Sequence, residues 1–167
     1  MAISCFSNLM YRIGYAEDIH RLVAGRRLMI GGLHIEAPFG EEAHSDGDVL
    51  LHAISEALLG ALSLGDLGTH FPDYLKETEG MDSKIILLET ICMVRDLGYE
   101  VVNIDTSIIL ERPKISPHMR KIKESISKIL NINVNQISVK ANTNEKLGAI
   151  GQGEAIKAVS VVMLKKK

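Results

Sequence analysis

One long helical segment with β-type segments on both sides limits the folds open to this chain of 167 residues. Residues 48–64 carry small and apolar side chains at helical spacing, and Gly65 follows as a stop signal. The apolar stripe of this segment comprises Val49, Ala53, Ala57 and Gly60. A buried central helix of this kind needs a sheet or other helices around it.

The remaining segments alternate between strand and helix patterns. We expect strands at 11–19, 99–110, 137–141 and 155–164, and a hairpin at 27–30 and 33–35 around Gly31-Gly32. Helices are expected at 82–97, capped by Asp82 and closed by Gly98, and at 117–130, opened by Pro117; a loop is expected at 68–80. This order predicts an α+β fold, an α/β sandwich with a mixed four-stranded-type sheet and helices on one face.

Composition supports one compact domain and excludes several partners. Apolar residues make up 46% of the chain and charged residues 24%, which fits a single domain over 11–167 behind an N-terminal extension, 1–10. The formal net charge of −2 predicts no nucleic-acid partner, and the basic residues within 112–128 are expected on a solvated helix face. No apolar run approaches the roughly 18 residues of a membrane span. Two distant cysteines indicate a reducing compartment, so we expect a cytoplasmic protein.

The pair Asp18 and His20 is a candidate metal site. Side chains two apart on a strand point to the same face, with Ile19 on the other. Carboxylate and imidazole are ligands that zinc prefers. The alternative is a polar strand edge with satisfied hydrogen bonds.

The segment 44–48 and the histidine after it form a second candidate site. Ser45 or Asp46 can cap the long helix, whose N-terminus attracts phosphate, and His44 would be a donor beside the same anion. His52 follows one turn into the helix, and Glu56 one turn later can orient its second ring nitrogen. Both segments have a structural alternative, a capping segment and a satisfied core histidine.

Three polar segments could bind a ligand, and each is equally explained as a turn. Asp66 and Asp73 lie in a glycine-flanked loop where carboxylates can accept hydrogen bonds from a diol. Residues 110–117 end a strand and are stiffened by two prolines, which leaves backbone groups able to meet a nucleobase edge. Residues 140–148 offer donors for phosphates, and Glu145 can hold a magnesium ion between them.

In this order, the segments resemble the 2-C-methyl-D-erythritol 2,4-cyclodiphosphate synthase family. The likeness extends from Tyr11 to the C-terminal end of the sequence. The matching segments are Arg12-Ile13-Gly14, Asp18-Ile19-His20, Ile30-Gly31-Gly32, Ala43-His44-Ser45-Asp46-Gly47-Asp48 with His52, Ala57-Leu58-Leu59-Gly60, Gly65-Asp66-Leu67-Gly68, Phe71-Pro72-Asp73, Pro113-Lys114, and Thr143 with Glu145-Lys146-Leu147-Gly148.

The resemblance implies a metal-dependent, cyclising phosphorus-oxygen lyase that works as a homotrimer with sites between subunits. Its substrate would be 4-diphosphocytidyl-2-C-methyl-D-erythritol 2-phosphate, and its products the 2,4-cyclodiphosphate and CMP. Zn²⁺ would be bound by Asp18, His20 and His52, and a second ion, Mg²⁺ or Mn²⁺, by Glu145. Positioning and charge neutralisation are enough for such an internal attack, since the phosphate is already anionic.

The same resemblance implies roles for further residues. His44 and Thr143 match positions that stabilise the transition state. The expected methylerythritol pocket comprises Asp66, Leu67, Gly68, Phe71, Pro72, Asp73, Tyr74 and Leu75. The expected cytidine and diphosphate contacts, contributed by a neighbouring subunit, are Leu110, Glu111, Arg112, Pro113, Lys114, Ile115, Ser116, Asn142, Thr143, Asn144 and Glu145. Substrate contacts are also expected from Asp18, Ile19, His20, His44 and Ser45.

The chain departs from the family pattern after residue 148. Ala149 and Gln152 replace an aromatic residue and an arginine, which in relatives line a cavity on the trimer axis that can hold isoprenoid diphosphates, so such binding stays open here. Two other functions stay open as alternatives. One is a different zinc phosphotransfer or phosphodiester enzyme, and the other is a non-catalytic zinc trimer that binds a nucleotide or an isoprenoid diphosphate.

Overall fold

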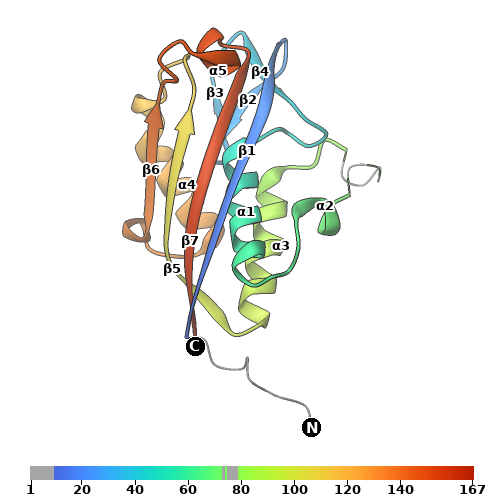
Figure 1. Ribbon diagram of the computed structural model, residues 1–167, viewed down its shortest axis with the longest axis vertical. Coiled ribbons are helices and arrows are strands. Elements are labelled where there is room, and N and C mark those ends of the chain that lie inside the picture. Colours follow the sequence, from blue (N-terminus) through green and yellow to red (C-terminus); the bar gives the residue numbers. More distant parts are fainter. Residues whose placement is uncertain (1–9, 73, 75–78) are drawn as a thin grey trace.

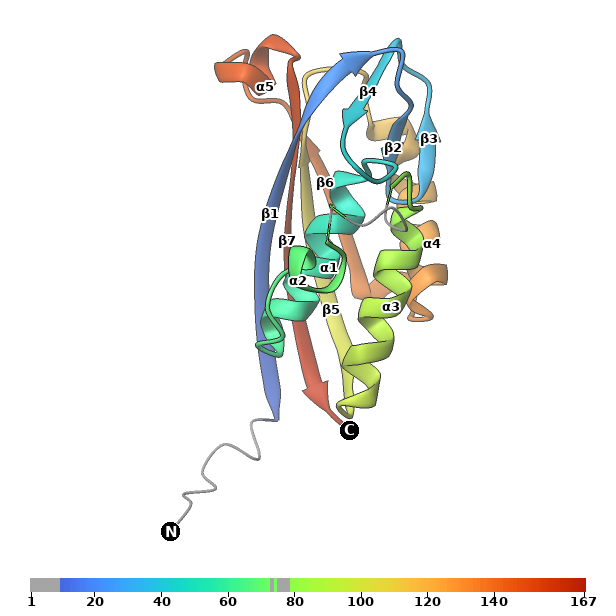
Figure 2. The same cartoon turned by 90° about the vertical axis from the view of Figure 1, so that its right-hand side faces the viewer.

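A computed structural model of the chain describes residues 10–72, 74 and 79–167. A mixed sheet forms one layer, and helices cover one of its faces (Figures 1 and 2). The predicted N-terminal extension lies outside the described residues except for Met10, whose carbonyl accepts a hydrogen bond from Lys166. The strands of the main sheet are β1 (Tyr11–Ala24), β4 (Phe39–Glu42), β5 (Tyr99–Ile109), β6 (Ile137–Asn142) and β7 (Ala155–Lys166).

The sheet has five strands in the order β4-β1-β7-β5-β6, so the prediction of a four-stranded sheet was wrong. The missed strand is β4, which pairs with the end of β1 from Arg21↔Glu42 to Ala24↔Phe39. It has four residues, among them Gly40 and two glutamates, and so lacks the alternating apolar pattern that identifies a strand. The predicted hairpin is confirmed as a separate two-stranded sheet, formed by β2 (Leu28–Ile30) and β3 (Leu33–Ile35).

The predicted helices are present with small changes at their ends. The long segment forms α1 (Val49–Ala61), in which eleven of 13 residues are buried, and the next forms α3 (Ser83–Asp96) with Asp82 as its cap. The third is α4 (Met119–Leu130), preceded by the 3₁₀ turn η2 (Ser116–His118). Two short helices, α2 (Leu67–His70) and α5 (Gly148–Gln152), and the 3₁₀ turn η3 (Val134–Gln136) lie in segments expected to be loops.

Asp48 caps α1, not Ser45 or Asp46 as the sequence suggested. Its side chain accepts a hydrogen bond from the N–H of Leu51 and further bonds from Gly31 and Gly32 in the turn of the β2–β3 hairpin. One fully buried carboxylate therefore joins the hairpin to the start of the helix.

The backbone of β1 touches α1 directly at Gly14. A Cβ atom added at this glycine would lie 1.8 Å from the carbonyl oxygen of Ala57. Two residues earlier, the guanidinium of Arg12 donates to the carbonyl of Ala61 at 2.7 Å, near the end of α1. Strand β1 and helix α1 thus approach more closely than any side chain at position 14 would permit.

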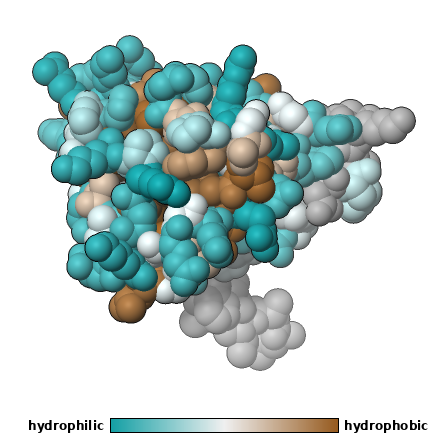
Figure 3. All heavy atoms as spheres, turned by 90° about the horizontal axis from the view of Figure 1, so that it is seen from above, coloured by the Kyte–Doolittle hydropathy of each residue, from teal (hydrophilic) through white to brown (hydrophobic). Residues whose placement is uncertain are grey.

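The opposite face of the sheet is not covered by the long helices, and α5 projects on this side at its upper end (Figure 2). Apolar side chains remain exposed there, along β1 and on β7. They are Tyr11, Ile13, Tyr15, Ile19 and Val161. Seen from above, the molecule is mostly hydrophilic with small apolar areas between polar side chains (Figure 3). Among the described residues, no helix has both the length and the apolar character required to cross a membrane.

Substituting Gly14 with alanine should destabilise the protein, because the new methyl group overlaps the backbone of α1. The expected loss is about 1–3 kcal/mol or more, the usual cost of overpacking. Gly60→Ala is the matched control: nothing lies within 4 Å of its Cβ position, so alanine should stabilise α1. Thermal unfolding of the two variants should give melting temperatures that move in opposite directions; a stable Gly14→Ala protein would contradict the packing described.

Candidate functional site

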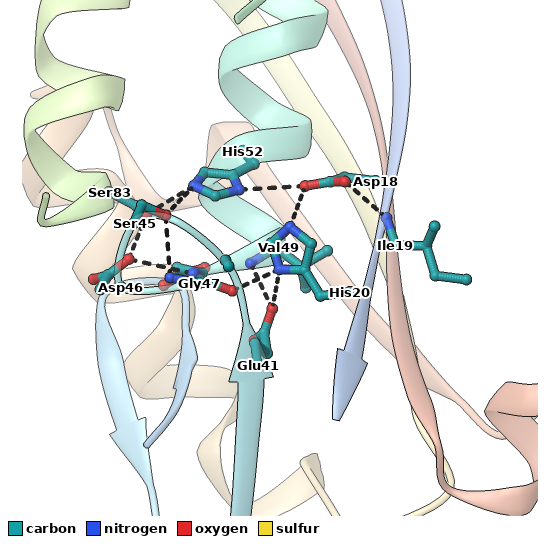
Figure 4. A network of polar contacts seen from close by, with 12 residues as sticks. Asp18, Ile19, His20, Glu41, Ser45, Asp46, Gly47, Val49, His52 and Ser83 are labelled. Atoms are coloured by element: carbon teal, nitrogen blue, oxygen red, sulfur yellow. Dashed lines mark hydrogen bonds and ion pairs between the residues drawn. The ribbon is translucent and has the colours of Figure 1, made fainter. Parts of the chain in front are cut away.

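Three predicted metal ligands converge where β1 crosses α1. Asp18 Oδ2 lies 3.0 Å from His20 Nε2 and 3.3 Å from His52 Nδ1 (Figure 4). One potential ligand atom from each residue falls within 4.8 Å of the others. The strand alternation expected from the sequence brings Asp18 and His20 together, and the close contact of α1 adds His52. We call this group the Asp-His-His cluster.

Two hydrogen-bond acceptors contact Nδ1 of His20, the ring nitrogen that faces away from the cluster. Its Nδ1 lies 2.6 Å from Glu41 Oε2 and 2.9 Å from the carbonyl oxygen of Gly47. Nδ1 must therefore carry the proton, which leaves the lone pair of Nε2 directed at the cluster. No sequence pattern pointed to Glu41, because β4 was not identified as a strand.

The ring of His52 is held by two serine hydroxyls. Its Nε2 lies 3.1 Å from Ser45 Oγ and 2.9 Å from Ser83 Oγ, at the start of α3. The hydroxyl of Ser83 is itself hydrogen-bonded to Asp46. Both serines therefore accept from Nε2–H, and Nδ1 faces Asp18.

Glu56 does not orient His52, contrary to the hypothesis drawn from their spacing. Its carboxylate accepts a hydrogen bond from the N–H of Leu67 at 2.8 Å, because the first turn of α2 offers unsatisfied donors beside it. Donors at the start of α1 are also used within the chain, as Val49 N–H donates to Glu41. The sequence analysis expected the N-terminus of this helix to attract phosphate, but the N–H of Val49 is not open to it.

The electrostatics of the cluster favour a bound cation. Burial disfavours the charged form of Asp18, but hydrogen bonds with His20 and His52 hold its pKa well below the ordinary range. Burial also lowers the pKa of His20, yet hydrogen bonds with Asp18 and Glu41 outweigh it and raise the pKa to about 10. Without a metal, the cluster therefore binds a proton. With both rings directing a lone pair inward, the donor set fits a divalent metal ion.

Two cavities adjoin the cluster. The larger, of about 280 Å³, is lined by His20 and His52 together with four other predicted residues, His44, Ser45, Leu67 and Phe71. The other, of about 230 Å³, is lined by Asp18, His52, Glu17, Glu56 and Leu67. Most of the residues expected near the metal thus share one region. We call the first cavity the metal-side cavity.

Eight of the predicted nucleotide contacts line a separate cavity of about 240 Å³, here called the nucleotide-side cavity. Its lining has no residue in common with the metal-side cavity. The predicted residues in it are Leu110, Glu111, Pro113, Lys114, Ile115, Ser116, Asn142 and Thr143. Arg112 lines a neighbouring hollow and lies over the ring of Phe39. The predicted metal-side and nucleotide-side residues therefore line two separate cavities in one chain.

The turn after β6 has a defined conformation. Glu145 and Lys146 both adopt positive φ, and Glu111 Oε1 accepts hydrogen bonds from the N–H groups of Asn144 and Lys146. The hydroxyl of Thr143 donates to Glu145 at 3.0 Å. Glu111 thus holds the turn that presents these polar groups.

Other predicted contacts lie apart from both cavities. The side chain of Ile19 points away from the cluster (Figure 4), and Asp66 caps α2 by accepting from Thr69. Gly68 lies within this short helix, Pro72 follows its C-terminal cap, and Tyr74 is strongly exposed. Asp73 and Leu75 lie outside the described residues.

The fold and site together define an α+β protein with an Asp-His-His cluster of metal-binding type beside an open cavity. The chain belongs to the YgbB family, whose family model matches residues 11–165.

Curated relatives are similar along nearly their whole length. A 2-C-methyl-D-erythritol 2,4-cyclodiphosphate synthase from Chloroherpeton thalassium is 50% identical over 155 residues, which cover 93% of this chain and 99% of the relative. The synthase of the same name from Fusobacterium nucleatum is 46% identical over 158 residues, 95% of this chain and 99% of the relative.

Solved structures agree with this similarity. A 2C-methyl-D-erythritol-2,4-cyclodiphosphate synthase in a CDP-bound form is 38% identical, with a TM-score of 0.86. The match covers 92% of this chain and 100% of that chain. The bifunctional IspDF of Campylobacter jejuni is 36% identical with a TM-score of 0.91, and the match covers 94% of this chain but 42% of that protein.

Substituting His52 with alanine should abolish metal binding without unfolding the protein, because one of three ligands is removed and only a small cavity is created. Metal content after dialysis, measured by atomic emission, should fall to background while sedimentation shows the same oligomer as the wild type. His34→Ala, which changes an exposed histidine on β3, should keep its metal. Wild-type metal content in His52→Ala would refute the ligand set.

Proposed function

We propose that this chain is a 2-C-methyl-D-erythritol 2,4-cyclodiphosphate synthase of the non-mevalonate isoprenoid pathway. It converts 4-diphosphocytidyl-2-C-methyl-D-erythritol 2-phosphate to the 2,4-cyclodiphosphate and releases CMP, as a cyclising phosphorus-oxygen lyase. The observation that carries this proposal is the Asp-His-His cluster at the edge of a cavity that also contains His44, in a chain of this family. The reaction needs no external co-reactant, since the substrate supplies both nucleophile and leaving group.

The proposed cofactors are two divalent ions. Zinc is assigned to Asp18, His20 and His52, and Mg²⁺ or Mn²⁺ to Glu145. Three protein ligands leave an open position for substrate, as in reactive zinc sites. When bound, such ions neutralise phosphate charge and polarise the phosphorus-oxygen bonds.

The residues of the chain act mainly by positioning. An oxygen of the 2-phosphate forms the new bond to the β-phosphorus, and the bond from that phosphorus to the bridging oxygen breaks, so CMP leaves with that oxygen. His44 lies in the metal-side cavity, where it can donate to phosphate oxygens as charge shifts toward the leaving group. The Thr143 hydroxyl is assigned the same role from the nucleotide side. No protein base is required, because the attacking phosphate is already ionised.

The nucleotide-side cavity is assigned to the cytidine and diphosphate groups. Backbone groups of the segment 110–116 are suited to hydrogen bonds with a base edge, and Lys114 supplies a cation for a phosphate. The methylerythritol portion is assigned to the region of Asp66, Gly68 and Phe71 beside the metal-side cavity.

We further propose a homotrimer in which each site combines the metal side of one subunit with the nucleotide side of the next. Two observations support it: the two cavities share no lining residue, and β1 exposes Ile13, Tyr15 and Ile19 on the uncovered sheet face. Several exposed apolar side chains along one strand of an uncovered sheet face are typical of an interface. We also propose a cytoplasmic location, as expected from the two distant cysteines. No nucleic-acid partner is expected from the net charge of −2, and no membrane partner is expected because the sequence has no apolar run of membrane-spanning length.

A phosphorus NMR assay with the diphosphocytidyl substrate, Zn²⁺ and Mg²⁺ tests the activity directly. CMP should appear together with a cyclic diphosphate. CMP with an open-chain bisphosphate would mean a hydrolase on the same scaffold. No turnover by zinc-loaded protein would favour the alternative of a non-catalytic trimer that binds a nucleotide or an isoprenoid diphosphate.

Substituting Thr143 with valine should lower kcat while leaving zinc content unchanged, because the hydroxyl lies in the nucleotide-side cavity and contacts none of the three zinc ligands. Removing one such donor typically costs about 10²–10³-fold in kcat. Zinc content and kcat measured on the same sample separate this outcome from a damaged metal site; loss of zinc would contradict the assignment.

Co-expressing His52→Ala with Thr143→Val tests the shared site. In mixed trimers, an intact metal side from one variant can meet an intact nucleotide side from the other, so roughly one site in four is restored by random assembly. Activity of the mixture should exceed that of either variant alone. Activity equal to the average of the separate variants would show that each chain forms its own site.

A further inference from the structure

Glu41 is a buried carboxylate directly behind a proposed metal ligand. Its side chain has no solvent exposure, and its Oε2 lies 2.6 Å from His20 Nδ1 and 3.1 Å from the N–H of Val49 (Figure 4). It therefore links three elements: β4, which carries it, β1, which carries His20, and α1, which begins at Val49. A residue at such a junction can serve the fold, the site, or both.

We propose that Glu41 is a positioning residue of the metal centre, whose carboxyl group contacts Nδ1 of His20 and fixes the ring with Nε2 toward the ion. This inference rests on the metal site of the proposed function. Carboxylates that accept the second N–H of a ligating histidine fix its tautomer and increase its basicity.

Fold stability accounts for only one oxygen of this side chain, Oε2, which accepts from the N–H of Val49 at the start of α1. Among the described residues, the other oxygen of Glu41, Oε1, is buried without a hydrogen-bond partner. Leaving such an atom unpaired costs free energy of folding, and a buried charge costs more. A neutral side chain of the same size would serve the packing better, which points to a role in the site.

The backbone beside Glu41 is shaped to admit it. Gly47 has a φ of +87°, and a Cβ atom there would lie 2.9 Å from the Cβ of Glu41. The carbonyl of the same glycine also accepts from His20 Nδ1 at 2.9 Å. Because this second acceptor remains when Glu41 is changed, the tautomer of His20 should persist, and the main loss should be the effect of the carboxyl group on ring orientation and basicity.

The two ligand histidines are thus supported differently. His52 is held by the neutral hydroxyls of Ser45 and Ser83, whereas His20 is held by a carboxylate. Nδ1 of His20 thus contacts a carboxyl group, whereas Nε2 of His52 contacts hydroxyls only. Because a carboxyl acceptor orients a ligating histidine and increases its basicity, Glu41 should affect how tightly the ion is held.

Glu41→Gln tests this role, since glutamine keeps the shape and one acceptor but replaces the carboxyl group with an amide. Zn²⁺ affinity of the purified full chain should fall on the order of 10-fold, measured by competition with a chromophoric chelator. The visible absorption spectrum of the Co²⁺-loaded protein should shift. The melting temperature of the metal-free variant should equal or exceed that of the metal-free wild type.

Asp48→Asn is the matched control. Asp48 is the other fully buried carboxylate at the start of α1, but its bonds go to backbone N–H groups and not to a histidine. This variant should melt at a lower temperature while its folded form binds Zn²⁺ with wild-type affinity and gives an unchanged Co²⁺ spectrum.

The outcomes distinguish a failure of the proposed metal site from a failure of the role proposed for Glu41. If the wild-type chain binds no Zn²⁺, the proposed metal site itself is wrong. A wild-type chain that binds Zn²⁺, with Glu41→Gln binding it equally well and showing the same Co²⁺ spectrum, would overturn the role of Glu41 alone. Equal losses of stability and affinity in both variants would make Glu41 a structural residue and also overturn the inference.

Discussion

The direct contact between β1 and α1 is the constraint on which the rest of the structure depends. Gly14 lets the helix backbone lie against the strand, and Arg12 fixes the end of the helix to the same strand. Four residues after Gly14 the strand presents Asp18, and His52 on the helix meets it. The distance between the ligands is therefore set by backbone packing and not by the ligands themselves.

The groups that orient the ligands come from further segments of the chain. Glu41 belongs to the edge strand β4, Ser45 to the loop before α1, and Ser83 to the start of α3. The cluster is thus complete only when the sheet edge and two helices are in place. A short sequence motif can provide the ligands, but their orientation is a property of the folded domain.

The difference between local motifs and contacts made by distant segments explains how much the sequence could predict. Helical periodicity identified α1, α3 and α4, and strand alternation placed Asp18 and His20 on one face, because these signals are local. The strand β4 was missed because four residues with a glycine show no period, and Glu56 was misassigned because spacing cannot reveal that α2 competes for its carboxylate. Ser83 contacts His52 across 31 positions of sequence, which no local pattern reports.

The uncovered sheet face has a consequence for the newly made chain. Ile13, Tyr15 and Ile19 are in contact with water until another surface covers them, and exposed apolar strands readily associate in unintended ways. In the proposed trimer, a subunit released from the ribosome at low concentration would stay longest in this state. The rate at which subunits meet would then compete with aggregation, and the yield of native protein would depend on how fast the chain is synthesised relative to chaperone capacity.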